Sequence, residues 1–347
     1  MGADDAAGCV GGAVIYIEPF AGGGGSWLPL LRRGLVPPCA WMGGKRRLAS
    51  DIHALLDVRP GVLLLLGDAS WWGWVWPVVL DAGSGPRVSE VLRGWRNEDP
   101  RALWFRLRDM GPVDRTADPA GAAAQLLWLQ ARAASGVPVW WEGDGSWQAG
   151  GYNIGQRARD ERRRLLQHAS SQVDDAGQRQ ATEPRLVMRR AAEGDSPACA
   201  NGYHGGPESG SRGGGIIDPG TIARRLDAIR GAAEGVRGSI EHIDAKTFTA
   251  RYAASLGARA RVYLDPPYAD CVGYPVACGR AKVLDIAARW AAAGARVVLS
   301  EAVPLANELG PGWTASELRG GSKPEWVTSF GCDVRALLPP LFSGWAS

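Results

Sequence analysis

The residues Asp265-Pro266-Pro267-Tyr268 could bind and orient a small polar group. They follow the apolar run Arg261–Leu264, and the prolines end that strand because proline lacks a backbone N–H and has a fixed φ. An acid, two backbone carbonyls and an aromatic ring are therefore held stiffly at a strand's carboxyl end. Open α/β sheets bind ligands at such ends. The alternative is a Pro-Pro turn capped by an aspartate.

A glycine-rich loop follows another apolar run, Val14–Glu18, and begins with Pro19 and Phe20. Glycines at positions 22 and 24 let the backbone approach a ligand closely, since glycine lacks a Cβ and tolerates positive φ. The spacing departs from the G-x-G-x-x-G of phosphate-binding dinucleotide loops and therefore favours a nucleoside without a phosphate. A plain glycine turn is the alternative.

Two further acids come after apolar runs. Asp68 follows Val62–Leu66, and Asp244 follows Ser239–Ile243. A carboxylate at a strand end can accept hydrogen bonds from both ribose hydroxyls of a nucleoside cofactor. Each acid could equally cap the helix that comes next.

Together these elements resemble the S-adenosylmethionine-dependent amino methyltransferases, and C-A-W-M-G-G-K-R-R at 39–47 resembles the K-W-x-G-G-K element of their DNA adenine methylase (Dam-like) family. In that family the element precedes the glycine loop, whereas here it follows it. The chain is therefore either a rearranged relative or has an unrelated Gly-Gly turn there. The resemblance implies S-adenosylmethionine as the cofactor, contacted by Glu18, Phe20, Gly22, Gly24, Trp41, Lys45, Asp68, Asp244 and Asp265.

The resemblance also implies the reaction, which is methyl transfer to the N6 amine of an adenine flipped out of double-stranded DNA. Asp265 and the Pro266 carbonyl would each accept an N–H of that amine. Pro267 would add stiffness, and Tyr268 would stack on the base. The alternatives are a cytosine-N4 DNA methyltransferase, an enzyme acting on RNA or on protein glutamine, and a DNA-binding protein without activity.

The elements that position these residues alternate as strands and helices over residues 1–94 and 236–347, which predicts a Rossmann-like α/β methyltransferase domain. Residues 95–235 interrupt it and are predicted to form a mainly helical DNA target-recognition insertion. Leu129–Asn153 loosely resembles the segment that opens this region in the family. Residues 169–215 are rich in Ser, Gly, Asp and Arg without periodicity, so we expect them to be mobile.

An arginine-rich helix is predicted over Arg157–His168. Its arginines could neutralise DNA phosphates, or they could form a solvated helix face. They are Arg157, Arg159, Arg162, Arg163 and Arg164. By contrast, the tryptophans at 71, 72, 74 and 76 are too densely spaced to share one face of an element, and we assign them no functional role.

Composition bounds the remaining possibilities. The formal net charge of the 347-residue chain is +3, so DNA binding requires a local basic face. The six cysteines are scattered without a C-x-x-C pair, which predicts neither a metal site nor a disulfide framework. The sequence shows no signal peptide and no apolar stretch long enough to span a membrane. We expect a cytoplasmic, bacterial or phage-encoded protein that is a monomer or a weak dimer.

Overall fold

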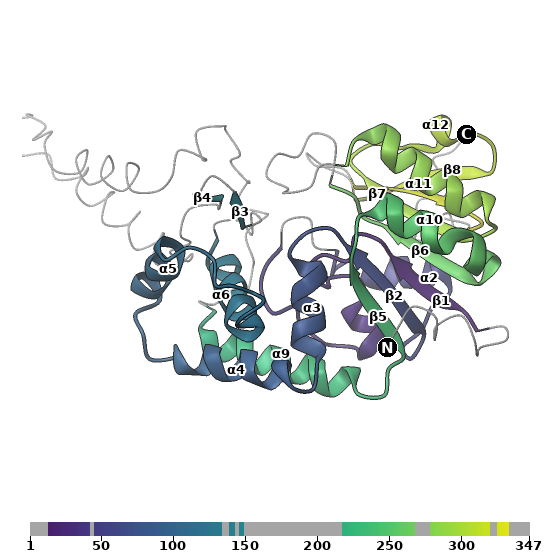
Figure 1. Ribbon diagram of the computed structural model, residues 1–347. Coiled ribbons are helices and arrows are strands. Elements are labelled where there is room, and N and C mark those ends of the chain that lie inside the picture. The colour runs from purple at the N-terminus through teal and green to yellow at the C-terminus, as the bar shows by residue number, and fades with distance from the viewer. Residues whose placement is uncertain are drawn as a thin grey trace, which may run out of the picture. The chain divides into compact units, whose positions relative to one another are not determined.

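A computed structural model describes residues 13–41, 45–133, 139–142, 146–148, 217–267, 278–319 and 325–332 (Figure 1). The chain divides into two compact units. The first contains Met1–Pro37, Gly43–Pro86 and Arg225–Ser347, and the second contains Pro38–Met42 and Arg87–Arg224. The predicted arginine-rich helix, its five arginines and the predicted mobile segment 169–215 lie outside the described residues, as does Tyr268.

The first unit contains a seven-stranded sheet in the order β5-β2-β1-β6-β7-β9-β8. The five strands from β5 to β7 run parallel, whereas β9 is antiparallel to both of its neighbours. This mixed, mostly parallel sheet confirms the predicted α/β fold. The strands are β1 (Ile15–Glu18), β2 (Leu63–Asp68), β5 (Gly238–His242), β6 (Ala260–Leu264), β7 (Arg296–Glu301), β8 (Trp313–Arg319) and β9 (Glu325–Phe330).

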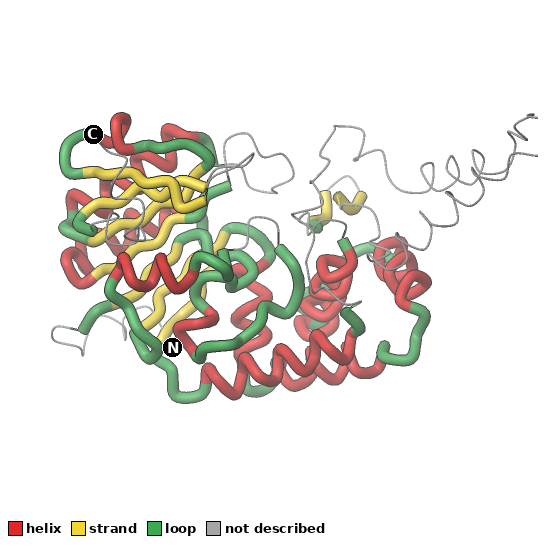
Figure 2. Tube along the Cα trace, turned by 180° about the vertical axis from the view of Figure 1, so that it is seen from behind, coloured by secondary structure: helices red, strands yellow, loops and turns green. Residues whose placement is uncertain are grey.

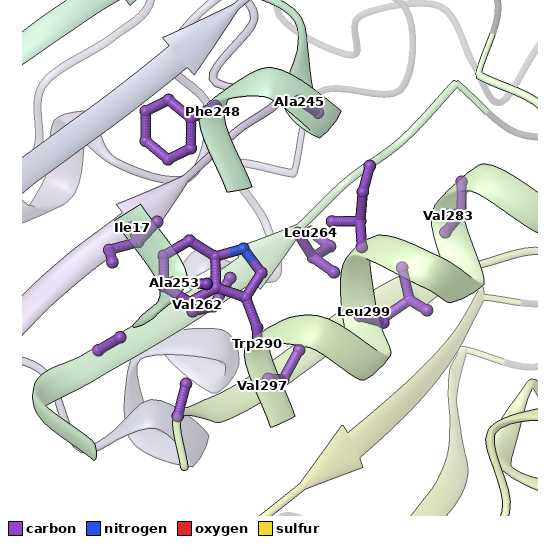
Figure 3. Packing of buried hydrophobic residues seen from close by; sticks show 14 of the residues in the cluster. Ile17, Ala245, Phe248, Ala253, Val262, Leu264, Val283, Trp290, Val297 and Leu299 are labelled. Carbon is purple, nitrogen blue, oxygen red and sulfur yellow. The ribbon is translucent and has the colours of Figure 1, made fainter. Parts of the chain in front are cut away.

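Helices cover both faces of this sheet, as the views from opposite sides show (Figures 1 and 2). On one face, Ile15 and Ile17 of β1 join a buried cluster with helices α10 (Ala245–Leu256) and α11 (Arg280–Ala292). In Figure 3 the Trp290 side chain lies beside Val262 in this cluster. Because side chains alternate along a strand, Tyr16 and Glu18 point to the opposite face. There Tyr16 meets His53 of α2 (Ala49–Leu56) edge-on.

Helix α3 (Trp72–Leu80) also belongs to the first unit, and it contains most of the dense tryptophans. Within this group, Trp72 and Trp76 lie one turn apart and stack with ring centroids 5.1 Å apart. Both are fully buried. A helix that is apolar on all sides belongs inside a core, which is why the density of tryptophans does not reveal a single face.

The described part of the second unit contains helices α5 (Pro100–Asp109) and α6 (Pro119–Arg132) and the antiparallel hairpin of β3 (Trp140–Glu142) and β4 (Ser146–Gln148). Both helices begin with an aspartate that caps the first turn and a proline at the first helical position, a favourable start. Two of the unit boundaries fall within α4 (Ser84–Gly94) and α9 (Pro219–Ala233).

Short helices complete the described structure: α1 (Leu28–Leu31), α12 (Ala306–Leu309) and a 3₁₀ turn at Gly257–Arg259. The sequence analysis did not predict α3, α4, α9 or β8. Among the described helices, we find none with the length and hydrophobicity needed to span a bilayer.

Candidate functional site

The candidate site lies where the strand order of the sheet reverses. Strand β1 stands between β2 and β6, and the chain leaves it toward β2 and later returns on the other side. Ligands of open α/β sheets bind at the carboxyl ends of the strands at such a switch point. Strands β1 and β6 are parallel neighbours, so the segments that follow them lie at the same edge of the sheet. These segments are the glycine loop and Asp265-Pro266-Pro267.

The glycine loop is anchored to the end of β2 and to α3. The Ala21 N–H donates to the Gly67 carbonyl at 3.0 Å, and the Gly22 N–H donates to Asp68 Oδ2 at 2.7 Å. The indole Nε1 of Trp76 donates to the Gly22 carbonyl at 2.8 Å. Trp76 is thus a positioning residue of the loop that the sequence analysis missed, because its contact depends on how α3 packs and not on local spacing.

Glycine is required in this loop by its backbone conformation. Gly22 has φ 46° and Gly24 has φ 87°, both in the left-handed region. A Cβ on Gly24 would lie 2.9 Å from Leu28 Cδ1 and 3.2 Å from Trp76 Cζ2. Both neighbours are fully buried, so a side chain at position 24 is strained by the positive φ and by this crowding.

We therefore predict that Gly24→Ala destabilises the protein more than Gly34→Ala does. Gly34 has nearly the same conformation, φ 85°, but nothing lies within 4 Å of its added Cβ. Both variants incur about 1–2 kcal/mol of backbone strain, and Gly24→Ala incurs a further cost of about 1–3 kcal/mol for overpacking. Urea unfolding of the two variants measures the difference, and equal losses would contradict the steric argument.

Asp68, the last residue of β2, is buried and makes several hydrogen bonds. Its Oδ1 accepts the Ser70 N–H at 2.7 Å and the Ser70 hydroxyl, and its Oδ2 holds Gly22. Burial raises the pKa of Asp68, although these hydrogen bonds oppose the rise. Helix α3 has Trp71 at its N-cap position, so Asp68 is not its cap. Oδ2, which accepts one of these three hydrogen bonds, has a further lone pair that could accept a hydroxyl.

Asp244 has the contacts of a helix cap. Its carboxylate accepts the backbone N–H groups of Lys246 at 3.1 Å and Thr247 at 3.2 Å, at the start of α10. Lys282 Nζ lies 3.4 Å away. The Thr247 hydroxyl contributes most to lowering the pKa of Asp244. These contacts match the capping alternative, and a cofactor role for Asp244 stays a prediction.

Glu18, the last residue of β1, is a fully buried acid held by two hydroxyls. Tyr16 donates to Oε2 at 2.8 Å, and Ser26 donates to Oε1. Burial raises the pKa of Glu18 well above its ordinary value, and the nearby Asp265 and Asp68 raise it further. A cation bound nearby would favour the ionised form. Phe20, two residues later, is partly buried against the hydrophobic cluster, and its cofactor role stays a prediction.

Lys45 joins two strand-end acids. Its Nζ lies 3.0 Å from Asp265 Oδ1 and 3.3 Å from Glu325 Oε1, and only 6% of the side chain is exposed. Burial lowers the pKa of Lys45, but the two acids outweigh this effect and raise it, so Lys45 stays an ammonium. The structure thus brings together Lys45 and Asp265, which the sequence analysis singled out from separate motifs.

Burial raises the pKa of Asp265 to about 6. Lys45 opposes this rise, whereas Glu325 adds to it. Sequence analysis missed Glu325, whose strand is antiparallel and therefore begins at the edge where the parallel strands end. No local pattern around Glu325 indicates this position.

This edge of the sheet is acidic. The acids there are Glu18, Asp68, Asp265, Glu325 and Glu301, the last residue of β7, whose pKa is also raised by burial. When ionised they carry more negative charge than Lys45 neutralises, so a cationic ligand is favoured. Trp41 is half-buried and belongs to the second unit, so its predicted cofactor role stays a prediction.

No protein-family model matches the chain, and no curated protein matches it. In the described ranges, no group of His, Cys, Asp and Glu side chains could hold a metal ion. The function is therefore argued from the geometry and charge at the carboxyl edge of the sheet.

Proposed function

We propose that this protein is a methyltransferase that uses S-adenosylmethionine to methylate the N6 amine of adenine in double-stranded DNA. The observation that carries the proposal is the contact between Lys45 and Asp265 at the switch point of the sheet, beside the glycine loop. Lys45 comes from the W-x-G-G-K element and Asp265 from the D-P-P-Y element, so their contact supports a single site despite the altered order of the motifs along the chain.

The residues at this edge fit the proposed cofactor. When bound, S-adenosylmethionine supplies an electrophilic methyl group on a positively charged sulfur. The excess of acids at this edge favours such a cation. The remaining lone pair of Asp68 Oδ2 suits a ribose hydroxyl, and the glycines at 22 and 24 allow close approach of the backbone.

Asp265 and the Pro266 carbonyl are suited to hold an exocyclic amine. The lone pair of such an amine is delocalised into its ring, so it is a poor nucleophile until its N–H groups are drawn toward acceptors. Two acceptors on a segment stiffened by proline fix the orientation of the amine. Orientation of this kind can lower an activation barrier by up to about 7–11 kcal/mol. A carboxylate with a pKa of about 6 is mostly ionised at pH 7 and can accept a proton.

DNA binding must come from another part of the chain, because an acidic edge repels phosphates. We assign it to residues 95–235, with the arginines of the segment 157–168 on the phosphates. The assignment of these residues rests on the sequence alone.

The proposal is tested by incubating the purified protein with duplex DNA and S-adenosylmethionine carrying a labelled methyl group. Digestion to nucleosides should recover the label as N6-methyladenine. Recovery on cytosine would instead support the N4 enzyme, and label in RNA or on protein glutamine would support an enzyme that acts on that substrate. No transfer to any of these substrates would contradict a methyltransferase.

Asp68→Ala is predicted to weaken cofactor binding by about 10- to 100-fold, the loss of a charge-assisted hydrogen bond of about 1.5–3 kcal/mol. Titration calorimetry with S-adenosylmethionine measures the effect. The matched control is Asp81→Ala, which removes an aspartate with similar backbone contacts to Gly83 and Ser84 on the surface. Equal affinities of the two variants would exclude Asp68 from the cofactor site.

A further inference from the structure

Glu325 is a half-buried acid at the edge of the sheet that no motif or resemblance assigns to a role. It is the first residue of β9, and 17% of its side chain is exposed. It shares the Lys45 ammonium with Asp265, of which 19% is exposed. One buried ammonium therefore lies between two carboxylates.

This sharing bears directly on how Asp265 could bind a substrate. An amine that donates an N–H to Asp265 shares that carboxylate with Lys45 on Oδ1, and the charge-assisted bond from the ammonium is stronger than one from a neutral amine. Lys45 cannot simply leave, since a buried ammonium without a partner is strongly unfavourable. A second acid within reach lets Lys45 keep a partner while Asp265 accepts the N–H of the amine.

Strand geometry makes Glu325 suitable for that role. Glu325 lies two residues before Val327, which pairs with Ser300 of β7, and the Ser300 hydroxyl in turn contacts Tyr263 of β6 at 2.9 Å. Residues two apart on a strand point to the same face, so Glu325 lies on the face that carries Tyr263 and Asp265. The acid is thus held by a paired strand and not by a loop.

We propose that Glu325 is a positioning residue that retains the Lys45 ammonium while Asp265 accepts an N–H of the target amine. This inference rests on the proposed function. It predicts that loss of the Glu325 charge leaves Lys45 bound to Asp265 alone and so weakens the acceptance of the amine N–H by that carboxylate.

The test compares Glu325→Gln with the wild type in single-turnover methyl transfer to duplex DNA. We expect transfer to slow by about 10- to 100-fold, the scale of a misplaced reacting group. Glu325→Asp, which keeps the charge on a shorter side chain, should restore part of the rate. Glu317→Gln, the same change at an exposed position on the adjacent strand β8, should leave the rate unchanged.

A second readout distinguishes this role from a purely structural one. The charged and titratable groups that act on Asp265, or on which it acts, are Lys45, Glu325, Glu18, Glu301, Tyr16 and Tyr263. Since Glu325 raises the pKa of Asp265, Glu325→Gln should lower it. Carbon-13 NMR titration of the Asp265 carboxyl in the ligand-free protein should show its titration midpoint moved toward acid in this variant.

The outcomes separate this inference from the proposed function. A wild-type protein that transfers no methyl group overturns both. An active wild type overturns only this inference if Glu325→Gln reacts at the normal rate, or if the titration of Asp265 is unchanged in that variant. Slower transfer together with the acid shift supports both.

Discussion

Asp265→Ala is expected to reduce methyl transfer by about 10²–10³-fold or more while the protein stays folded. Groups that act on charge developing in the transition state have effects of this size. The fold should survive because Lys45 keeps Glu325 as a partner at 3.3 Å, so no buried ammonium is left unpaired. Cofactor binding should change less than turnover, because the Asp265 carboxylate acts mainly on the rehybridising amine.

Single-turnover transfer of a labelled methyl group measures this loss, with calorimetry of cofactor binding in parallel. Asp285→Ala is the control, since Asp285 is an acid in an exposed pair with Arg289 on α11. Near-normal turnover of Asp265→Ala would contradict the proposed reaction. In the wild type, transfer should also decline as the pH falls through about 6, where Asp265 takes up a proton and loses its capacity to accept.

Lys45→Met is expected to lower the free energy of unfolding by about 3–5 kcal/mol at pH 7, because it leaves two partly buried carboxylates without their cation. The control is Lys282→Met, which breaks the more exposed pair with Asp244 and should cost no more than about 1 kcal/mol. Urea unfolding of both variants measures the difference. A loss for Lys45→Met no larger than for the control would contradict a structural role for the shared ammonium.

The loss in the free energy of unfolding caused by Lys45→Met should become smaller as the pH falls from 7 to 5. An unfolded aspartate titrates near about 3.9, whereas folding raises the pKa of Asp265 to about 6. A carboxyl group whose pKa is raised by folding binds protons more tightly in the folded state, so protonation stabilises the fold. Removing Lys45 raises that pKa further, since Lys45 lowers it in the wild type. A loss of stability in Lys45→Met that stays the same at every pH would contradict an electrostatic cause of that loss.

The parts of the site that sequence could predict are those determined locally. Pro266 and Pro267 end a strand whatever the rest of the chain does, and the glycines at 22 and 24 mark a backbone that other residues cannot follow. Asp68 is predictable for the same reason, as an acid that closes an apolar run.

The contacts that sequence could not predict depend on packing between distant elements. Trp76 reaches the Gly22 carbonyl only because α3 is buried against the glycine loop. Glu325 reaches Lys45 only because β9 runs against its neighbour β7. Hydrophobic periodicity indicates that a strand exists but contains no information about its direction in the sheet, so it could not bring that acid to this edge.

The direction of β9 also determines when the site can form. Lys45 precedes β2 in the chain, whereas Glu325, one of its two acidic partners, is the first residue of β9. Loop closure over such a separation is slow, because the chain entropy is lost before the contact is gained. During synthesis from the N-terminus, Lys45 can be shared between both acids only after residue 325 has emerged. Completion of the proposed active centre is therefore a late folding event, and an incompletely synthesised chain would lack it.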